Sequence, residues 1–109
     1  MKIIDKPWGQ EEILENNASY TVKRLTMKEG CQCSYQYHEK KRETIYVLSG
    51  ELVIISEEKK QKYFPGEFIT IPPYEKHRMA SEKGVTIYLE CSTSELEDIV
   101  RIKDDYGRK

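Results

Sequence analysis

Apolar and polar residues alternate in short runs along most of the chain, and turn-forming residues separate these runs at close intervals. Alternation with a period of two places every second side chain on the same face, which is typical of a strand with one buried face. The turns contain pairs such as Ser49-Gly50 and Pro72-Pro73, which favour reversals of the chain. The strands that we predict are residues 11–14, 20–27, 31–37, 44–48, 51–56, 61–64, 68–71, 77–80 and 85–91.

Many short strands at such spacing predict an all-β sandwich or barrel. The chain has 109 residues and a mass of 12.9 kDa, so we expect a single domain over residues 1–109 with one hydrophobic core. Trp8 stands between a proline and a glycine, and we expect its large ring to pack against the barrel. The one predicted helix is Ser94–Glu97, which has the spacing of a capping box. It lies in a C-terminal extension, residues 93–109.

The charges and apolar runs of the sequence argue against two classes of partner, nucleic acids and membranes. Charged residues make up 34% of the chain, but the formal net charge is only −1, so there is no basic stripe for nucleic acid. No apolar run approaches the roughly 20 residues that span a bilayer, and residues 1–6 lack the apolar centre of a signal peptide. We therefore expect a cytoplasmic protein without a nucleic-acid or membrane partner.

The three cysteines do not suggest a disulfide or a metal site. Cys31 and Cys33 are separated by one residue, unlike a Cys-x-x-Cys redox or zinc pair. If their strand is regular, both thiols lie on the face opposite Gln36 and His38, as packing or surface groups. Cys91 falls in an apolar strand, and we expect it in the core.

Residues 30–50 place three potential ligands close together. Gln36 and His38 are two residues apart on a strand, so their side chains point to the same face and can converge on one ion. Glu43 follows a charged turn and opens an apolar run that reads as the returning strand of a hairpin. The hairpin would therefore bring Glu43 back beside His38.

Residues 66–81 supply a fourth potential ligand, His77. It follows Pro72-Pro73, where a strand must end and the chain must turn, so it can enter the same cavity from a neighbouring strand. Each ligand alone could be an ordinary surface or core residue, but the chain has only two histidines and both fit this pattern.

Two imidazoles and two oxygen donors leave an open coordination position, as a catalytic metal site requires. We expect a divalent metal ion, with zinc first, and with manganese, nickel or iron compatible with the same ligands.

Together the two motifs resemble the signature motifs of cupins, and this resemblance implies a double-stranded β-helix, or jelly-roll barrel. The chain is similar over nearly its whole length to the mannose-6-phosphate isomerase domain at the C-terminal end of bifunctional mannose-1-phosphate guanylyltransferase/mannose-6-phosphate isomerases, the type II isomerases. In that family a glutamine replaces the first histidine of the general cupin motif, as Gln36 does here. The chain departs from the family at Tyr74, where a glycine normally follows the two prolines. The segments that carry the resemblance are 7–9, 22–26, 36–38, 49–50, 71–73, 75–78, 98–101 and 105–108.

The resemblance implies interconversion of mannose 6-phosphate and fructose 6-phosphate through an enediol. Such a reaction needs a Lewis acid, a base and a cationic clamp for the phosphate. For the clamp we consider Arg78, Lys76 and Arg24, since a guanidinium suits bidentate contact with phosphate. In a regular strand Lys76 and Arg78 would point away from the adjacent metal ligand, unless the turn is irregular. For the base we consider Glu90 and Glu75, although Glu90 could equally lie on the solvent face.

Two other functions stay open at this stage. A non-catalytic cupin could bind a sugar or a sugar phosphate, because one fold hosts many functions. An iron-dependent dioxygenase is disfavoured, since the amide of Gln36 is a weak donor for an oxygen-activating iron. We expect the partners to be a small sugar phosphate and a second copy of the chain, because open edge strands favour a homodimer.

Overall fold

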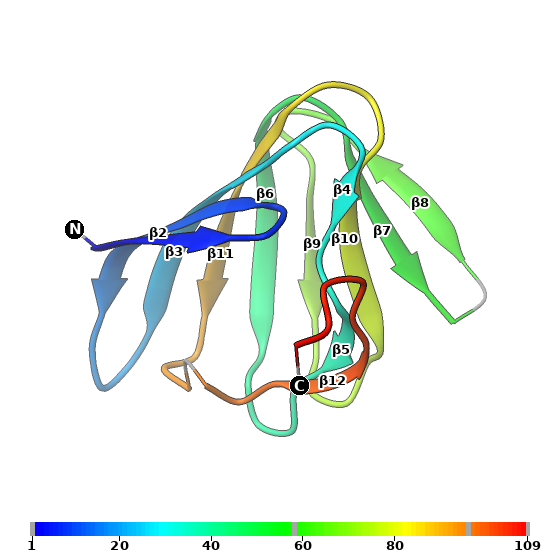
Figure 1. Ribbon diagram of the computed structural model, residues 1–109. Coiled ribbons are helices and arrows are strands. Elements are labelled where there is room, and N and C mark those ends of the chain that lie inside the picture. Colours follow the sequence, from blue (N-terminus) through cyan, green and yellow to red (C-terminus); the bar gives the residue numbers. More distant parts are fainter. Residues whose placement is uncertain (1, 58, 96, 109) are drawn as a thin grey trace.

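Twelve strands in two antiparallel sheets make up the computed structural model (Figure 1), which describes residues 2–57, 59–95 and 97–108. The first sheet has the order β1 (Lys2–Lys6), β2 (Gly9–Asn16), β3 (Thr21–Met27), β11 (Thr86–Ser92), β6 (Glu43–Ser49) and β9 (Phe68–Ile71). The second has the order β12 (Val100–Lys103), β5 (Tyr35–Tyr37), β10 (His77–Ser81), β7 (Leu52–Ser56) and β8 (Lys60–Tyr63), and β4 (Cys31–Gln32) also pairs with β10. The expected all-β barrel is confirmed.

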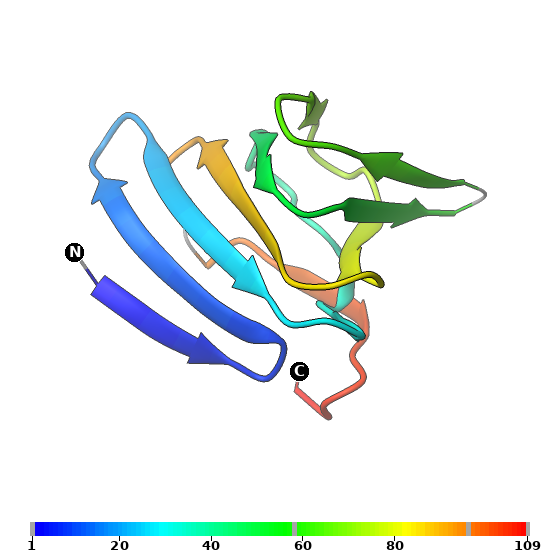
Figure 2. The ribbon, with the colours of Figure 1, turned by 90° about the horizontal axis from the view of Figure 1, so that it is seen from above.

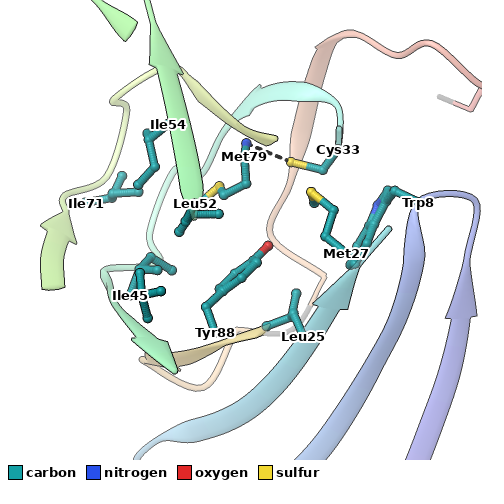
Figure 3. Packing of buried hydrophobic residues seen from close by; sticks show 11 residues of the cluster. Trp8, Leu25, Met27, Cys33, Ile45, Leu52, Ile54, Ile71, Met79 and Tyr88 are labelled. Carbon is teal, nitrogen blue, oxygen red and sulfur yellow. Dashed lines mark hydrogen bonds between the residues drawn. The ribbon is translucent and has the colours of Figure 1, made fainter. Parts of the chain in front are cut away.

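The two sheets lie as opposing layers when seen from above (Figure 2). Strand β3 shows how alternation builds this arrangement, since Thr21, Lys23, Leu25 and Met27 are buried while the residues between them are partly exposed. Tyr88 of β11 points into the space between the layers, among the other buried apolar side chains (Figure 3). The inward faces of both sheets therefore form one core.

The predicted strands all occur, but the chain contains features that local patterns did not indicate. The stretch 31–37 is broken into β4 and β5 because Cys33 and Ser34 leave the strand geometry. Strands β1 and β12 were not predicted. Both are short, charged and partly exposed, so pairing with β2 and β5, rather than a clear apolar face, defines them.

The helix expected at Ser94–Glu97 is wrong for its described residues, 94, 95 and 97, which form a bend and a turn, while Leu96 lies outside the described residues. This part of the chain connects β11 in one sheet to β12 in the other. Within the described ranges, no helix is long and apolar enough to cross a bilayer.

The predicted burial of Trp8 is confirmed, but that of Cys91 is not. Trp8 is 4% exposed and belongs to the core, as expected. Cys91 is exposed, so its placement in the core was wrong; it occupies the outward face of β11 between the buried Glu90 and Ser92. Cys33 is buried, and its sulfur accepts a hydrogen bond from the main-chain nitrogen of Met79 (Figure 3). Burial raises the pKa of the Cys33 thiol to about 11, so it remains a packing group.

Tyr74 adopts a positive φ of 68°, which no other non-glycine residue in the described ranges does. A left-handed conformation costs a residue with a Cβ atom roughly 1–2 kcal/mol. Two contacts offset this cost: the Tyr74 nitrogen donates to the carbonyl of His38, and its ring stacks on Tyr37 with 6.0 Å between centroids. The turn before His77 thus keeps a glycine-like conformation without a glycine.

Gly50 and Gly84 offer a test of the packing between β6, β7 and β11. Both have positive φ, but a Cβ on Gly50 would collide with the Val85 carbonyl and lie 2.9 Å from the Thr86 Cα, whereas a Cβ on Gly84 would meet nothing within 4 Å. We expect Gly84→Ala to lower the free energy of unfolding by about 1 kcal/mol. Gly50→Ala should lower it by roughly 1–3 kcal/mol more, because main-chain atoms must move. Urea denaturation measures both, and equal losses would contradict the close packing of Gly50 against Val85 and Thr86.

Candidate metal centre

Three of the four expected ligands meet inside the barrel. His38 follows β5, Glu43 opens β6 and His77 opens β10, so three strands deliver them to one point. One potential ligand atom from each residue lies within 4.8 Å of the other two. All three side chains are buried, with exposed fractions of 1–2%. The connection from β5 to β6 therefore does return Glu43 to His38, but the expected hairpin is wrong, because the two strands lie in different sheets and do not pair.

Main-chain carbonyls decide which nitrogen each imidazole presents to this cluster. His38 Nδ1 donates to the carbonyl of Asp98, and His77 Nδ1 donates to the carbonyl of Glu75 at 2.8 Å. A carbonyl can only accept, so both Nδ1 atoms must carry the proton. Both Nε2 atoms then face Glu43 Oε1, at 3.6 Å from His38 and 3.2 Å from His77. This is the orientation that a ligand histidine needs.

The electrostatics of the cluster favour an ionised carboxylate. Burial alone would raise the pKa of Glu43, but the close approach of His38 and His77 holds that pKa well below its usual range. Burial alone would lower the pKa of His77, but its contact with Glu43 raises it. Without a metal, a proton on His77 can therefore bridge to Glu43, and a bound cation would take its place.

Two atoms of the cluster show that a cation fits. Among the described residues, His38 Nε2 and Glu43 Oε2 are buried without a hydrogen-bond partner. Leaving such groups unpaired costs about 1–3 kcal/mol each, or more for a charged group. Two imidazoles and a carboxylate form a donor set that holds catalytic zinc with a further position open. The residues therefore suit a divalent metal ion.

Gln36, the fourth expected ligand, lies on the wall of a cavity that adjoins the cluster. It is paired with His77 in the register of β5 and β10, and it lines the cavity together with His38 and Glu43. Its amide oxygen accepts a hydrogen bond from Ser34 Oγ. Since an amide oxygen has two lone pairs, one remains for a metal or a substrate.

The cavity beside the cluster has a volume of about 120 Å³ and an unusual number of charges. Among the described residues, five cationic side chains line it against three carboxylates. The cations are Lys6, Lys23, Lys41, Arg101 and Arg108, and the carboxylates are Glu11, Glu43 and Glu90. An excess of positive charge in a partly closed cavity favours an anionic ligand.

Glu90 and Lys41 connect this cavity to the metal cluster. Glu90 is 8% exposed and lines the cavity, so its inward orientation on β11 is now established. Lys41 Nζ lies 3.3 Å from Glu90 Oε1 and 3.6 Å from Glu43 Oε2. Burial, followed by repulsion from Glu43, raises the pKa of Glu90. The site thus contains one buried carboxylate that is ionised and another that holds a proton more readily.

The three cations considered for the clamp lie elsewhere. Arg24 points away from the core on β3 and pairs with Glu12 through two contacts of 2.8 Å. Arg78 is buried, but its guanidinium donates to the Cys33 carbonyl and to Asp105. The structure brings neither guanidinium to the cavity lining.

Lys76 and Glu75 lie on the surface. Both are exposed and border an open depression beside β7. Glu75 also borders a second cavity of about 90 Å³, and His77 lines this second cavity rather than the first. The side chain of Glu75, one of the two residues considered for the base, thus borders a different opening from that of Glu90.

Asp98 is a site residue that the sequence did not indicate. Its carboxylate accepts hydrogen bonds from the main-chain nitrogens of Glu39, Lys40 and Lys41, at 3.1, 2.7 and 2.8 Å. Its carbonyl holds His38. Asp98 therefore fixes the loop between two ligands, across a stretch of chain so long that no local pattern reveals the contact.

Comparisons with known proteins identify a family profile and several relatives of the chain. The family profile described as "Cupin domain" matches residues 23–89. The alginate biosynthesis protein AlgA of Pseudomonas aeruginosa is 27% identical over 107 residues, which are 94% of this chain and 22% of that protein. The mannose-1-phosphate guanylyltransferase ManC of Salmonella typhimurium is 29% identical over 107 residues, again 94% of this chain and 22% of that protein. The chain thus spans less than a quarter of the length of these relatives.

Solved structures show the same fold. KdgF from Halomonas sp. superposes with a TM-score of 0.80 at 17% identity, covering 90% of each chain. A putative sugar phosphate isomerase from Acidithiobacillus ferrooxidans superposes with a TM-score of 0.64 at 20% identity, covering 69% of this chain and 50% of that one. At these identities the likeness establishes the fold alone.

Glu43→Gln tests the metal centre. We expect Zn²⁺ or Mn²⁺ at about one hundred times its Kd to add about 2.7 kcal/mol to the stability of the metal-free protein, and so to raise its Tm by more than about 5 °C. Glu43→Gln should remove most of this rise, because it deletes the charged ligand. Glu11→Gln is the control, since Glu11 lines the same cavity but pairs with Lys23 at 3.0 Å. An unchanged rise in Glu43→Gln would contradict the ligand assignment.

Asp98→Asn tests the support of His38. The change replaces an acceptor of the loop hydrogen bonds by a donor, so we expect metal affinity to fall about tenfold, as for other residues that orient ligands. Asp105→Asn is the control, because Asp105 lies on the same segment but pairs with Gln32 and Arg78. Titration of both variants with Co²⁺, followed by its visible spectrum, gives the affinities. Equal affinities in the two variants would remove Asp98 from the site.

Proposed function

Because the chain belongs to the cupin domain family, we propose that its metal centre interconverts mannose 6-phosphate and fructose 6-phosphate. The observation that carries the proposal is the buried His38–Glu43–His77 cluster beside a cavity whose cations outnumber its carboxylates. This combination suits a substrate that presents both an oxygen to a metal and a negative charge to the protein.

The names of similar proteins support the same substrate class. ManC is described as a mannose-1-phosphate guanylyltransferase, and one protein of the same fold as a putative sugar phosphate isomerase. Sugar phosphates are therefore the class that we assign to this cavity. The activity of the much longer relatives is not transferred as a whole, since the chain matches 22% of ManC.

The residues of the chain have separate roles in the proposed reaction. When bound, the divalent ion supplies a Lewis acid that polarises the substrate carbonyl. Glu90 moves the proton between the two adjacent carbons, because it is a buried carboxylate of the cavity outside the ligand set. Lys41, between Glu90 and Glu43, offsets the repulsion between the two carboxylates. The apolar wall formed by Trp8, Leu25 and other residues limits access of water to the enediol.

The size of the cavity favours the open-chain sugar. Its volume of about 120 Å³ is smaller than the roughly 300 Å³ at the lower end of typical small-molecule pockets. A pyranose ring with its phosphate would overfill it, whereas the carbonyl end of an extended chain is narrower. The isomerisation itself requires this open-chain form, so size and chemistry agree.

Glu90→Gln tests the proposed reaction. We expect metal-loaded protein to convert mannose 6-phosphate to fructose 6-phosphate, and the variant to lose at least about 100-fold in kcat, the usual contribution of a general base, while metal affinity is retained. Glu75→Gln should retain activity, because Glu75 is exposed and does not line the cavity of Glu90. A coupled assay of fructose 6-phosphate measures both variants. Binding of mannose 6-phosphate without turnover by the wild-type protein would instead identify a non-catalytic cupin.

A further inference from the structure

The C-terminal segment, residues 98–108, contributes to the cavity although it lies outside the region that matches the family profile, residues 23–89. Its strand β12 pairs with β5, and Arg101 stands directly opposite Gln36 in that register. Figure 1 shows the segment running beside β5 and then turning back over it. Arg101 and Arg108 are the two guanidinium groups that line the cavity in the described part of the chain. The barrel motifs and the anion-binding groups thus come from different parts of the chain.

The lysines of the cavity are already paired with its carboxylates. Lys23 Nζ lies 3.0 Å from Glu11, and Lys6 Nζ lies 3.9 Å from the same carboxylate. Lys41 lies between Glu90 and Glu43. Three lysines thus face three carboxylates, and the remaining cationic groups of the lining are the two arginines, of which Arg108 also pairs with Asp104 outside the lining.

Arg108 is held in a defined orientation. Its Nε and Nη2 donate to the Asp104 carboxylate, with the shortest contact at 2.8 Å, and its guanidinium lies over the Tyr106 ring at 5.6 Å from the centroid. Asp104 is not part of the cavity lining, and its side chain is 2% exposed. It engages one edge of the guanidinium plane, which leaves the edge that carries Nη1 for a ligand. Because the side chain is already ordered, little entropy is lost on binding.

The segment is also anchored to the barrel. Asp105 accepts hydrogen bonds from Gln32 at 2.6 Å and from Arg78 at 3.3 Å, and Asp98 binds the loop after His38. Arg78 therefore has an indirect role: it holds the segment that carries the cavity arginines. This gives a physical reason for an arginine next to a metal ligand but pointing away from it.

We propose that Arg101 and Arg108 form a clamp for the phosphate group of the substrate. A planar guanidinium matches two phosphate oxygens at once, which a lysine cannot do. The identity of the sugar rests on the proposed function, but the clamp requires only that the ligand be a phosphate monoester. Its position on a separate segment makes this segment the element that selects phosphorylated over unphosphorylated sugars.

Arg101→Gln and Arg108→Gln test the clamp in metal-loaded protein. Each should weaken mannose 6-phosphate binding about 10- to 100-fold, the loss expected when one charged hydrogen-bonding partner is removed. Lys103→Gln is the matched control, since Lys103 is an exposed cation on the same strand, outside the cavity lining. Calorimetry gives the affinities, and the metal stoichiometry should be unchanged in all three variants. Asp104→Asn, which keeps the charge of Arg108 but loosens it, should have a smaller effect in the same direction.

The outcomes separate the clamp from the isomerase. Unchanged mannose 6-phosphate affinity in both arginine variants would overturn the clamp, and so would a loss that Lys103→Gln shares. If the wild-type protein does not bind mannose 6-phosphate at all, inorganic phosphate is the second probe. Binding of inorganic phosphate that both arginine variants lose would keep the clamp while the proposed sugar is abandoned. Failure of the wild-type protein to bind inorganic phosphate as well would overturn it.

Discussion

Two hydrogen bonds to main-chain carbonyls determine what the site can do. Because His38 Nδ1 and His77 Nδ1 each donate to a carbonyl, both Nε2 atoms face the buried Glu43. If either ring turned over, the carbon Cε1 would take the place of Nε2 and could not ligate a metal. The cost of leaving His38 Nε2 and Glu43 Oε2 buried without hydrogen-bond partners is tolerable because the surrounding barrel is well packed and because a cation would relieve it. The fold therefore holds a cluster whose unpaired atoms a cation would satisfy.

The barrel places this polar site and its apolar core on the same inward faces. On β3 the inward positions change from Thr21 and Lys23 to Leu25 and Met27 within seven residues. Lys23 is neutralised by Glu11 on the neighbouring strand β2, so the transition from polar cavity to apolar core leaves no isolated charge on this strand. Such paired charges cost less to bury than single ones. The polar cavity and the apolar core thus occupy different parts of the same strand.

Local alternation was sufficient to predict most of the strands, and the short connection from His38 to Glu43 was sufficient to predict that these two ligands meet. It was insufficient where the strand is irregular or where distant segments meet. The break at Cys33-Ser34 places Cys33 on the cavity side with Gln36, against the expected parity. Arg24 was chosen for its guanidinium, although the alternation with Leu25 and Met27 indicates that Lys23 faces inward; that signal was present in the sequence. The contacts of Asp98 and Arg108 had no such signal, because both depend on where the C-terminal segment crosses the barrel.

The division of the site between a barrel and an added segment bears on how the fold acquires specificity. The region 23–89 that matches the cupin profile contains every residue of the metal cluster, while the guanidinium groups of the cavity come from residues beyond it. Proteins with this fold, from KdgF to a putative sugar phosphate isomerase, superpose well at identities of 17–20%, so the barrel itself cannot define a substrate. A segment anchored by Asp98 and Asp105 can change its cavity-facing residues without disturbing the ligands, provided that its anchors are kept. If the added segment selects the substrate as proposed, this selection is independent of the metal cluster except at Asp98, whose carbonyl holds His38 and whose carboxylate fixes the loop that follows.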